Sequence, residues 1–129
     1  MITAIVYSAL AVSGWCSDTQ EDPRSKLETA IPYFIRLLEE EKYDEFIDKA
    51  FRRSVLEDIL ARQSRDELIN ELKGGRKRVL ELLKVVKELK GEPFEPLLKE
   101  DETGMRYRLP DGKVIINFYK RMGLWYGSF

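Results

Sequence analysis

The C-terminal end of the chain alternates between apolar and polar positions with the period of two that is typical of half-buried strands. Residues 105–109, 113–120 and 124–129 form three such runs, and the second and third are rich in aromatic side chains. Pro-Asp-Gly at 110–112 and Arg-Met-Gly at 121–123 separate the runs, and proline and glycine favour chain reversal. This end of the chain therefore predicts an antiparallel meander.

Upstream of the predicted strands, apolar residues recur at the three- and four-residue spacing of amphipathic helices. The stripes over residues 27–38, 43–51 and 55–60 predict three helices. The segment Ser25–Glu28 has the spacing of a capping box, which marks the start of the first helix. Pro32 lies inside the first stripe, so we expect it either to kink that helix or to move its start to a later residue.

A fourth helical stripe ends at Leu89 and begins after Ser64, which has the capping-box spacing to Glu67. We expect Gly74-Gly75 to break or bend this helix, because glycine destabilises a helix interior. Gly91 stands where a glycine commonly ends a helix.

Between the last helix and the meander, residues 92–96 contain two prolines and are expected to be extended. Leu97-Leu98 is expected to begin a first strand before an acidic turn at 100–104. Helices first and strands last predict an α+β domain, with N-terminal helices packed on a C-terminal antiparallel β-meander. A chain of 129 residues fits one such domain, which we place at residues 25–129.

The N-terminal segment, residues 1–17, carries no charged side chain, and residues 18–24 follow it as a polar linker. The apolar segment has roughly the length of a signal peptide and is short for a membrane span, so we expect export or membrane attachment. Cys16 is a candidate lipid-attachment residue, although Trp15 before it departs from the lipoprotein pattern. The alternative is an ordinary strand or helix of the fold and a cytoplasmic protein.

The composition removes whole classes of chemistry. The chain has no histidine, which excludes Ser-His-Asp and Cys-His nucleophile systems and histidine-containing metal sites within one chain. A single cysteine excludes intrachain disulfides and zinc ribbons. We expect no cofactor, no metal site and no recognisable catalytic constellation, so the enzyme interpretation is disfavoured. The formal net charge of −1 also makes nucleic acid an unlikely partner.

Two groups of residues are candidates for binding. Aromatic side chains on the predicted strands could wall a pocket for an apolar or aromatic ligand, although aromatic residues of strands more often form the core. These are Tyr107, Phe118, Trp125 and Tyr126. The other group, Arg76, Lys77 and Arg78, lies in a stretch with seven basic and two acidic residues between Lys73 and Lys90, and could bind an anion.

Three segments resemble the nuclear-transport-factor-2-like fold, which includes the SnoaL-like cyclases. Phe34–Phe51, FIRLLEEEKYDEFIDKAF, is similar to the opening helices of that family. Gly123–Phe129, GLWYGSF, looks like its last strand, and Asp111–Lys113 looks like the preceding hairpin. The resemblance implies a cone-like curved sheet, a pocket at its wide end and a homodimer through the open sheet face. It implies no single activity, because this fold carries enzymes and binding domains alike.

Three functional hypotheses follow. The leading one is a non-catalytic binding or accessory domain that is exported or attached to the cell envelope. The second is an enzyme or carrier that holds a small molecule in the aromatic pocket. The third is a cytoplasmic module that binds an anionic partner through the basic helix.

Overall fold

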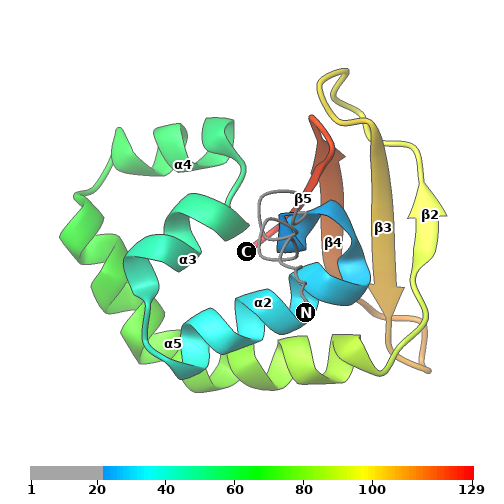
Figure 1. Ribbon diagram of the computed structural model, residues 1–129, viewed down its shortest axis with the longest axis horizontal. Helices are drawn as coiled ribbons and strands as arrows, with labels where there is room; N and C mark the ends of the chain where they lie inside the picture. The colour runs from blue at the N-terminus through cyan, green and yellow to red at the C-terminus, as the bar shows by residue number, and fades with distance from the viewer. Residues whose placement is uncertain (1–21) are drawn as a thin grey trace, which may run out of the picture.

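The computed structural model describes residues 22–129, which form helices followed by a sheet (Figure 1). The helical elements are η2 (Pro23–Ser25), α2 (Leu27–Glu39), α3 (Tyr43–Ala50), α4 (Arg53–Leu60) and α5 (Arg65–Lys87). The strands are β2 (Glu92–Phe94), β3 (Thr103–Arg108), β4 (Val114–Arg121) and β5 (Leu124–Gly127). All neighbours pair antiparallel in the order β2-β3-β4-β5, which confirms the predicted α+β class and the meander.

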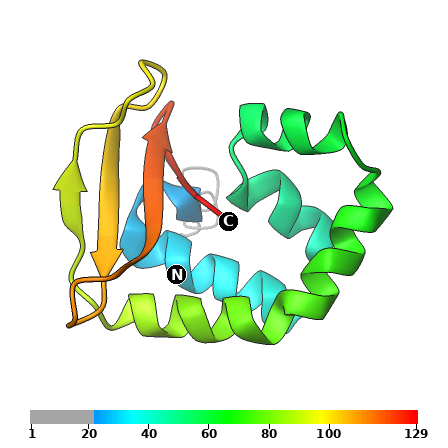
Figure 2. The same ribbon diagram turned by 180° about the vertical axis from the view of Figure 1, so that it is seen from behind.

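The helices and the sheet occupy opposite ends of the molecule, as Figures 1 and 2 show. α2 and α5 run side by side from the sheet to the far end, where α3 and α4 lie. The sheet is not strongly curled, and in this respect it differs from the cone that the family resemblance implies.

The start of α2 differs from the prediction. Its N-cap residue is Lys26, which makes no side-chain cap, so the capping box expected at Ser25–Glu28 is wrong. The Asp22 carboxylate instead caps the preceding turn of 3-10 helix by accepting a hydrogen bond from the Arg24 backbone N–H at 2.9 Å. Residues 22–24, the end of the predicted linker, therefore take part in the packing, and Arg24 is buried. Pro32 lies within α2 and does not move its start.

α5 confirms one prediction and corrects two. Ser64 Oγ accepts from the Glu67 backbone N–H at 3.1 Å, while the Glu67 carboxylate accepts from the Ser64 N–H at 2.8 Å, so this capping box is present. The helix runs without a break through Gly74-Gly75. The apolar residues of α5 are buried both before and after Gly74-Gly75, and this packing outweighs the low helix propensity of the two glycines. The helix ends at Lys87, so Gly91 is not its stop signal.

The first strand also lies elsewhere than predicted. It is Glu92–Phe94, whereas Leu97 is fully exposed and Leu98 is half exposed in the loop that follows. Phe94 pairs with Gly104 in the sheet, and its ring occupies the space that a side chain at Gly104 would need. This ring packing fixes the position of the strand.

The hydrophobic core joins the helices to one face of the sheet. Five phenylalanine rings meet in it at centroid distances of 5.2–6.4 Å, namely Phe34, Phe46, Phe51, Phe118 and Phe129. Tyr107, Ile116 and Trp125 extend this core along the strands. Both predicted turns are present between the strands, with positive φ at Gly112, Met122 and Gly123.

Candidate functional site

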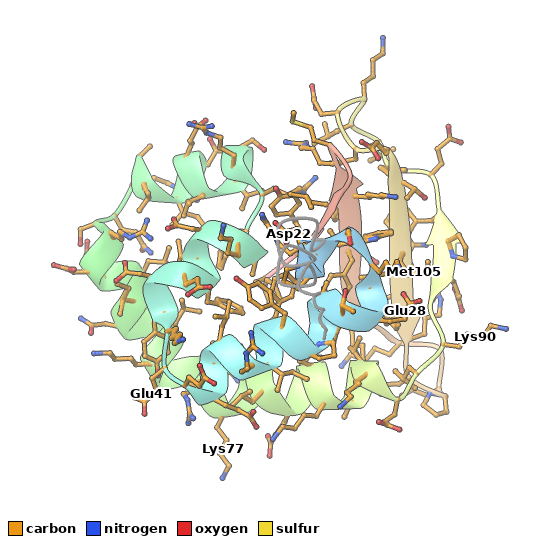
Figure 3. All side chains as sticks on the ribbon, viewed as in Figure 1. Asp22, Glu28, Glu41, Lys77, Lys90 and Met105 are labelled. Atoms are coloured by element: carbon orange, nitrogen blue, oxygen red, sulfur yellow. The ribbon has the colours of Figure 1, made fainter. Side chains whose placement is uncertain are left out.

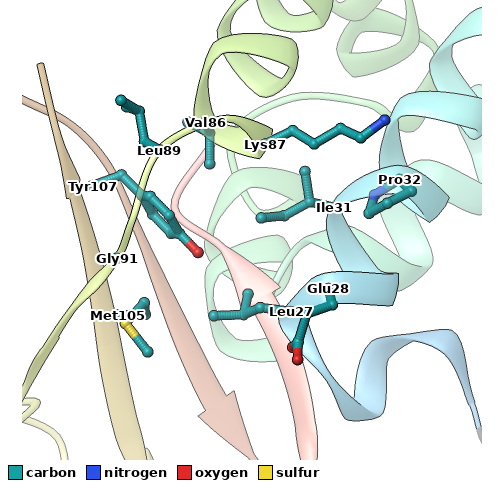
Figure 4. A pocket seen from close by; sticks show the side chains of 10 residues that line it. All are labelled: Leu27, Glu28, Ile31, Pro32, Val86, Lys87, Leu89, Gly91, Met105 and Tyr107. Carbon is teal, nitrogen blue, oxygen red and sulfur yellow. The ribbon is translucent and has the colours of Figure 1, made fainter.

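A hollow of about 410 Å³ lies between the helices and the sheet, and we call it the helix–sheet hollow (Figure 4). Its lining residues are Leu27, Glu28, Ile31, Pro32, Val86, Lys87, Leu89, Gly91, Met105 and Tyr107. The volume falls in the range of about 300–1,000 Å³ that small-molecule sites occupy. The walls are mostly aliphatic, and the polar groups are few.

Three elements meet at this hollow because each presents an apolar face to it. The first turns of α2 contribute Leu27 and Ile31, and the last turn of α5 contributes Val86. Gly91 lies so close to β3 that an added Cβ would be 2.5 Å from Met105 Cγ and 3.0 Å from Tyr107 Cζ. The absence of a side chain at residue 91 therefore allows the chain after α5 to lie against β3 and close one side of the hollow.

Tyr107 supplies the main polar group of the hollow. Its ring is buried edge-on against Phe118, with 5.8 Å between the centroids, and its hydroxyl points between β3 and α2 (Figure 4). Among residues 22–129, no side chain or backbone group forms a hydrogen bond with this hydroxyl. Burial, with a smaller contribution from the Glu28 carboxylate, raises the pKa of Tyr107. The hydroxyl therefore stays protonated and is available as a donor.

α2 adds acceptors to the same hollow. Pro32 has no amide hydrogen, so the Glu28 carbonyl oxygen lacks the donor that normally comes from four residues later. The Glu28 carboxylate and the Lys87 ammonium are exposed and lie at separate points of the rim (Figure 4). The proline that the sequence marks as a helix defect thus lies in the wall of the hollow.

The four aromatic residues predicted to wall one pocket lie in different places. Tyr107 lines the helix–sheet hollow, whereas Phe118 and Trp125 are buried in the core. Tyr126 lies at another surface hollow beside α3 and α4, with the Arg24 guanidinium 5.3 Å from its ring centroid. Sequence reasoning identified Tyr107 but missed Gly91, Pro32 and the residues around them, because their proximity to β3 arises only on folding.

The three basic residues predicted to bind an anion also differ in their surroundings. Arg76 Nε donates to the Leu38 carbonyl at 2.7 Å and Nη2 donates to the Glu39 carbonyl at 3.1 Å, so this guanidinium caps the C-terminus of α2. Lys77 and Arg78 are exposed, and Figure 3 shows Lys77 directed away from the helices. Lys77 and Arg78 are therefore the accessible members of the predicted group.

The predicted lipid-attachment residue, Cys16, and the apolar N-terminal segment 1–17 lie outside the described part of the chain. Within residues 22–129, no cluster of three or more acidic or sulfur side chains is placed to hold a metal ion. No helix in that range has the length and apolar character needed to cross a membrane.

Comparison with family models, with curated proteins and with solved structures finds no match to this chain.

Proposed function

We propose that this protein is a non-catalytic binding domain that holds a small amphipathic molecule in the helix–sheet hollow. The observation that carries the proposal is the protonated Tyr107 hydroxyl, which has no partner among residues 22–129 and points into a hollow with aliphatic walls. The hydroxyl oxygen keeps contact with solvent, because within residues 22–129 the buried side-chain polar atom without a hydrogen-bond partner is Arg121 Nη2 and not this oxygen. A ligand oxygen that replaces water beside Tyr107 would accept the same hydrogen bond, and the aliphatic walls would cover its apolar part.

The charges around the hollow favour a neutral ligand with an apolar body. The rim carries one carboxylate, Glu28, and one ammonium, Lys87, both exposed, so their charges oppose each other and the hollow selects neither a cation nor an anion. A ligand hydroxyl would suit the site, because it can accept from Tyr107 and donate to an oxygen of Glu28. The aliphatic walls would then cover the rest of the molecule.

Binding fits the site better than acid–base catalysis does. A catalytic acid or base works best when its pKa lies near the working pH. The pKa of Tyr107 is raised from the ordinary value of 10.0, which moves this group further from neutrality. The raised pKa thus preserves a hydrogen-bond donor and makes a poor base.

The test is an NMR titration of the protein with 4-phenylbutanol, following backbone amide signals. A ligand of about 11 non-hydrogen atoms at about −0.3 kcal/mol each binds with a Kd of about 4 mM. We expect saturable shifts at Ile31, Gly91 and Met105. Tyr107→Phe should weaken binding about fivefold through the lost hydrogen bond, whereas Tyr126→Phe should not. Equal affinity of the Tyr107→Phe variant, or shifts confined to other surfaces, would refute the proposal.

Export and membership of the nuclear-transport-factor-2-like fold remain proposals on narrower support. The apolar segment 1–17 supports export, and the mass of the protein purified from its native cells tests it, because cleavage or lipid attachment at Cys16 changes that mass. The family assignment is supported by the sequence likenesses at Phe34–Phe51, Asp111–Lys113 and Gly123–Phe129, while the weak curl of the sheet counts against it.

A further inference from the structure

A second hollow, of about 420 Å³, lies on the face of the sheet opposite the core, and we call it the arginine hollow. Its lining residues are Arg52, Phe94, Glu95, Leu97, Leu98, Asp101, Arg106 and Tyr119. Successive residues of a strand point to opposite faces, so Gly104 and Arg106 lie opposite Met105 and Tyr107 of the first hollow. The two hollows therefore share strand β3 but open on different faces.

The floor of the arginine hollow is aromatic. The strand pairing places Phe94, Gly104 and Tyr119 in one row across β2, β3 and β4. The Phe94 ring covers Gly104 and meets the Tyr119 ring edge-on, with 5.7 Å between the centroids. A side chain at residue 104 would collide with that ring, so the glycine is what lets the Phe94 ring lie beside Tyr119.

Two guanidinium groups lie on this floor. The Arg52 guanidinium is 4.1 Å from the Tyr119 ring centroid, and that of Arg106 is 4.3 Å from the Phe94 ring centroid. Stacking on a ring holds a guanidinium plane in one orientation while its N–H groups stay available at the edge. Both side chains are therefore oriented before any ligand arrives.

The hydrogen bonds of these arginines leave donors free. Arg52 donates through Nη1 to Asp101 at 2.7 Å, and Arg106 donates through Nε to the Asn117 amide oxygen at 3.3 Å. A guanidinium has five N–H donors, so most donors of both groups have no partner within residues 22–129. Arg106 in particular has no carboxylate partner in that part of the chain.

The arginine hollow is lined by two arginines and two acids, Glu95 and Asp101, but neither acid pairs with Arg106. Asp101 is buried and shared, because the Arg121 Nε also donates to it at 3.1 Å. Glu100 lies 3.6 Å from Arg121 and is mostly exposed, and Glu95 is exposed at the rim. Solvent screens these exposed carboxylates, so the interior of the hollow favours an anion.

The rim of the arginine hollow carries exposed apolar side chains. Leu97 is fully exposed and Leu98 is 49% exposed, and both lie in the loop after β2. Two adjacent leucines beside two stacked arginines form a surface that suits a ligand with an anionic end and an apolar end. Nucleobases fit it poorly, because the arginines already cover the aromatic rings on which bases would stack.

We propose that the arginine hollow binds an organic carboxylate. Its carboxylate oxygens accept hydrogen bonds from the free N–H groups of Arg52 and Arg106, since planar guanidinium groups match carboxylates. Its apolar body lies against Leu97 and Leu98 at the rim. This site is separate from the helix–sheet hollow, and it is proposed to take an anionic ligand where that hollow takes a neutral one.

The test compares three probes in NMR titrations of the protein: 4-phenylbutyrate, 4-phenylbutanol and inorganic phosphate. We expect 4-phenylbutyrate to bind in the millimolar range and to shift the amide signals of Phe94, Leu98 and Arg106. The alcohol lacks the anion and phosphate lacks the apolar body, so each should bind there at least about tenfold more weakly. Equal binding of either one would overturn the proposal.

Substitutions distinguish binding at the arginine hollow from a non-specific attraction of the anion to charged surface residues. Arg106→Gln should weaken 4-phenylbutyrate binding about tenfold through lost charge-assisted hydrogen bonds. Arg108→Gln is the matched control on the same strand, because Arg108 pairs with Glu92 and does not line the hollow. Leu97→Ser should weaken binding about threefold without affecting folding, since Leu97 is fully exposed. Unchanged affinity in both Arg106→Gln and Leu97→Ser, or no shift at these signals at about 20 mM probe, refutes the site.

Discussion

The continuity of α5 through Gly74-Gly75 leads to a prediction that ordinary equilibrium unfolding can test. Replacing both glycines by alanine should stabilise the protein. Neither position has an atom within 4 Å of an added Cβ, apart from the helix's own nearby backbone, so the change brings no collision and no new packing. The effect then reduces to the difference in helix propensity and in the freedom of the unfolded chain.

The size of the expected stabilisation follows from the helix propensities of glycine and alanine. Glycine in a helix interior is about 0.8–1 kcal/mol less favourable than alanine. The double substitution Gly74→Ala with Gly75→Ala should therefore raise the free energy of unfolding by about 1.5–2 kcal/mol. For a chain of this size, that corresponds to a rise in Tm of roughly 5–8 °C. Urea denaturation followed by circular dichroism at 222 nm measures the change.

The chain offers a matched control for this experiment. An added Cβ at Gly123 also meets nothing within 4 Å, but this residue has a φ of +80° in the turn between β4 and β5. Gly123→Ala should lower the free energy of unfolding by about 1 kcal/mol, because alanine is strained in that backbone conformation. If Gly74→Ala with Gly75→Ala gives no gain or a loss, while Gly123→Ala behaves as expected, the helix does not run straight through both glycines in solution.

Three further predictions concern polar side chains that hold the elements together. Arg76→Gln should lower the free energy of unfolding, measured in urea, by about 1.5–3 kcal/mol, because it removes two charge-assisted hydrogen bonds to the end of α2. The control Lys77→Gln should lower it by less than about 0.5 kcal/mol. Equal effects of the two substitutions would contradict the capping role. Asp101→Asn should lower the free energy of unfolding by about 3 kcal/mol, because it leaves the mostly buried guanidinium groups of Arg52 and Arg121 without their shared carboxylate. A loss below about 1 kcal/mol would show that this pairing contributes little to stability. Burial, followed by a hydrogen bond to Glu45, raises the pKa of Tyr33 from 10.0 to about 12. The pKa of Tyr33 is higher in the folded state, so its contribution to stability is complete below pH 10 and is lost as the pH rises towards 12. Tyr33→Phe should reduce the fall in the free energy of unfolding between pH 10 and 12. An unchanged dependence of that free energy on pH would exclude Tyr33 as its source.

The features that were predictable from sequence depend on neighbours along the chain. The Ser64 capping box formed as predicted because both partners lie within one helical turn. The turns at 110–112 and 121–123 formed because glycine supplies positive φ locally. The order of helices followed by a meander follows from the change of hydrophobic period along the chain.

Two of the predictions that failed, the position of the first strand and the role of Gly91, did so where a distant contact outweighed a local signal. Leu97-Leu98 has strand-like composition, but Phe94 fills the space above Gly104, and the first strand lies there instead. Gly91 resembles a helix stop, yet its role is to lie close to Tyr107 across the helix–sheet hollow. These contacts join residues that are at least ten positions apart in the chain, so the spacing of apolar and polar residues along the sequence does not predict them.

The sequence by itself determined the element types, the α+β class and the aromatic character of the strands, because these depend on local propensity and hydrophobic period. Only the tertiary structure decided which groups share a hollow. It placed Tyr107 and Tyr126 at different hollows, assigned Arg76 to the end of α2, and brought Arg52 and Arg106 to one hollow over neighbouring aromatic rings. The physical reason is that burial and hydrogen bonding are settled by packing between distant segments, which the order of residues along the chain does not display.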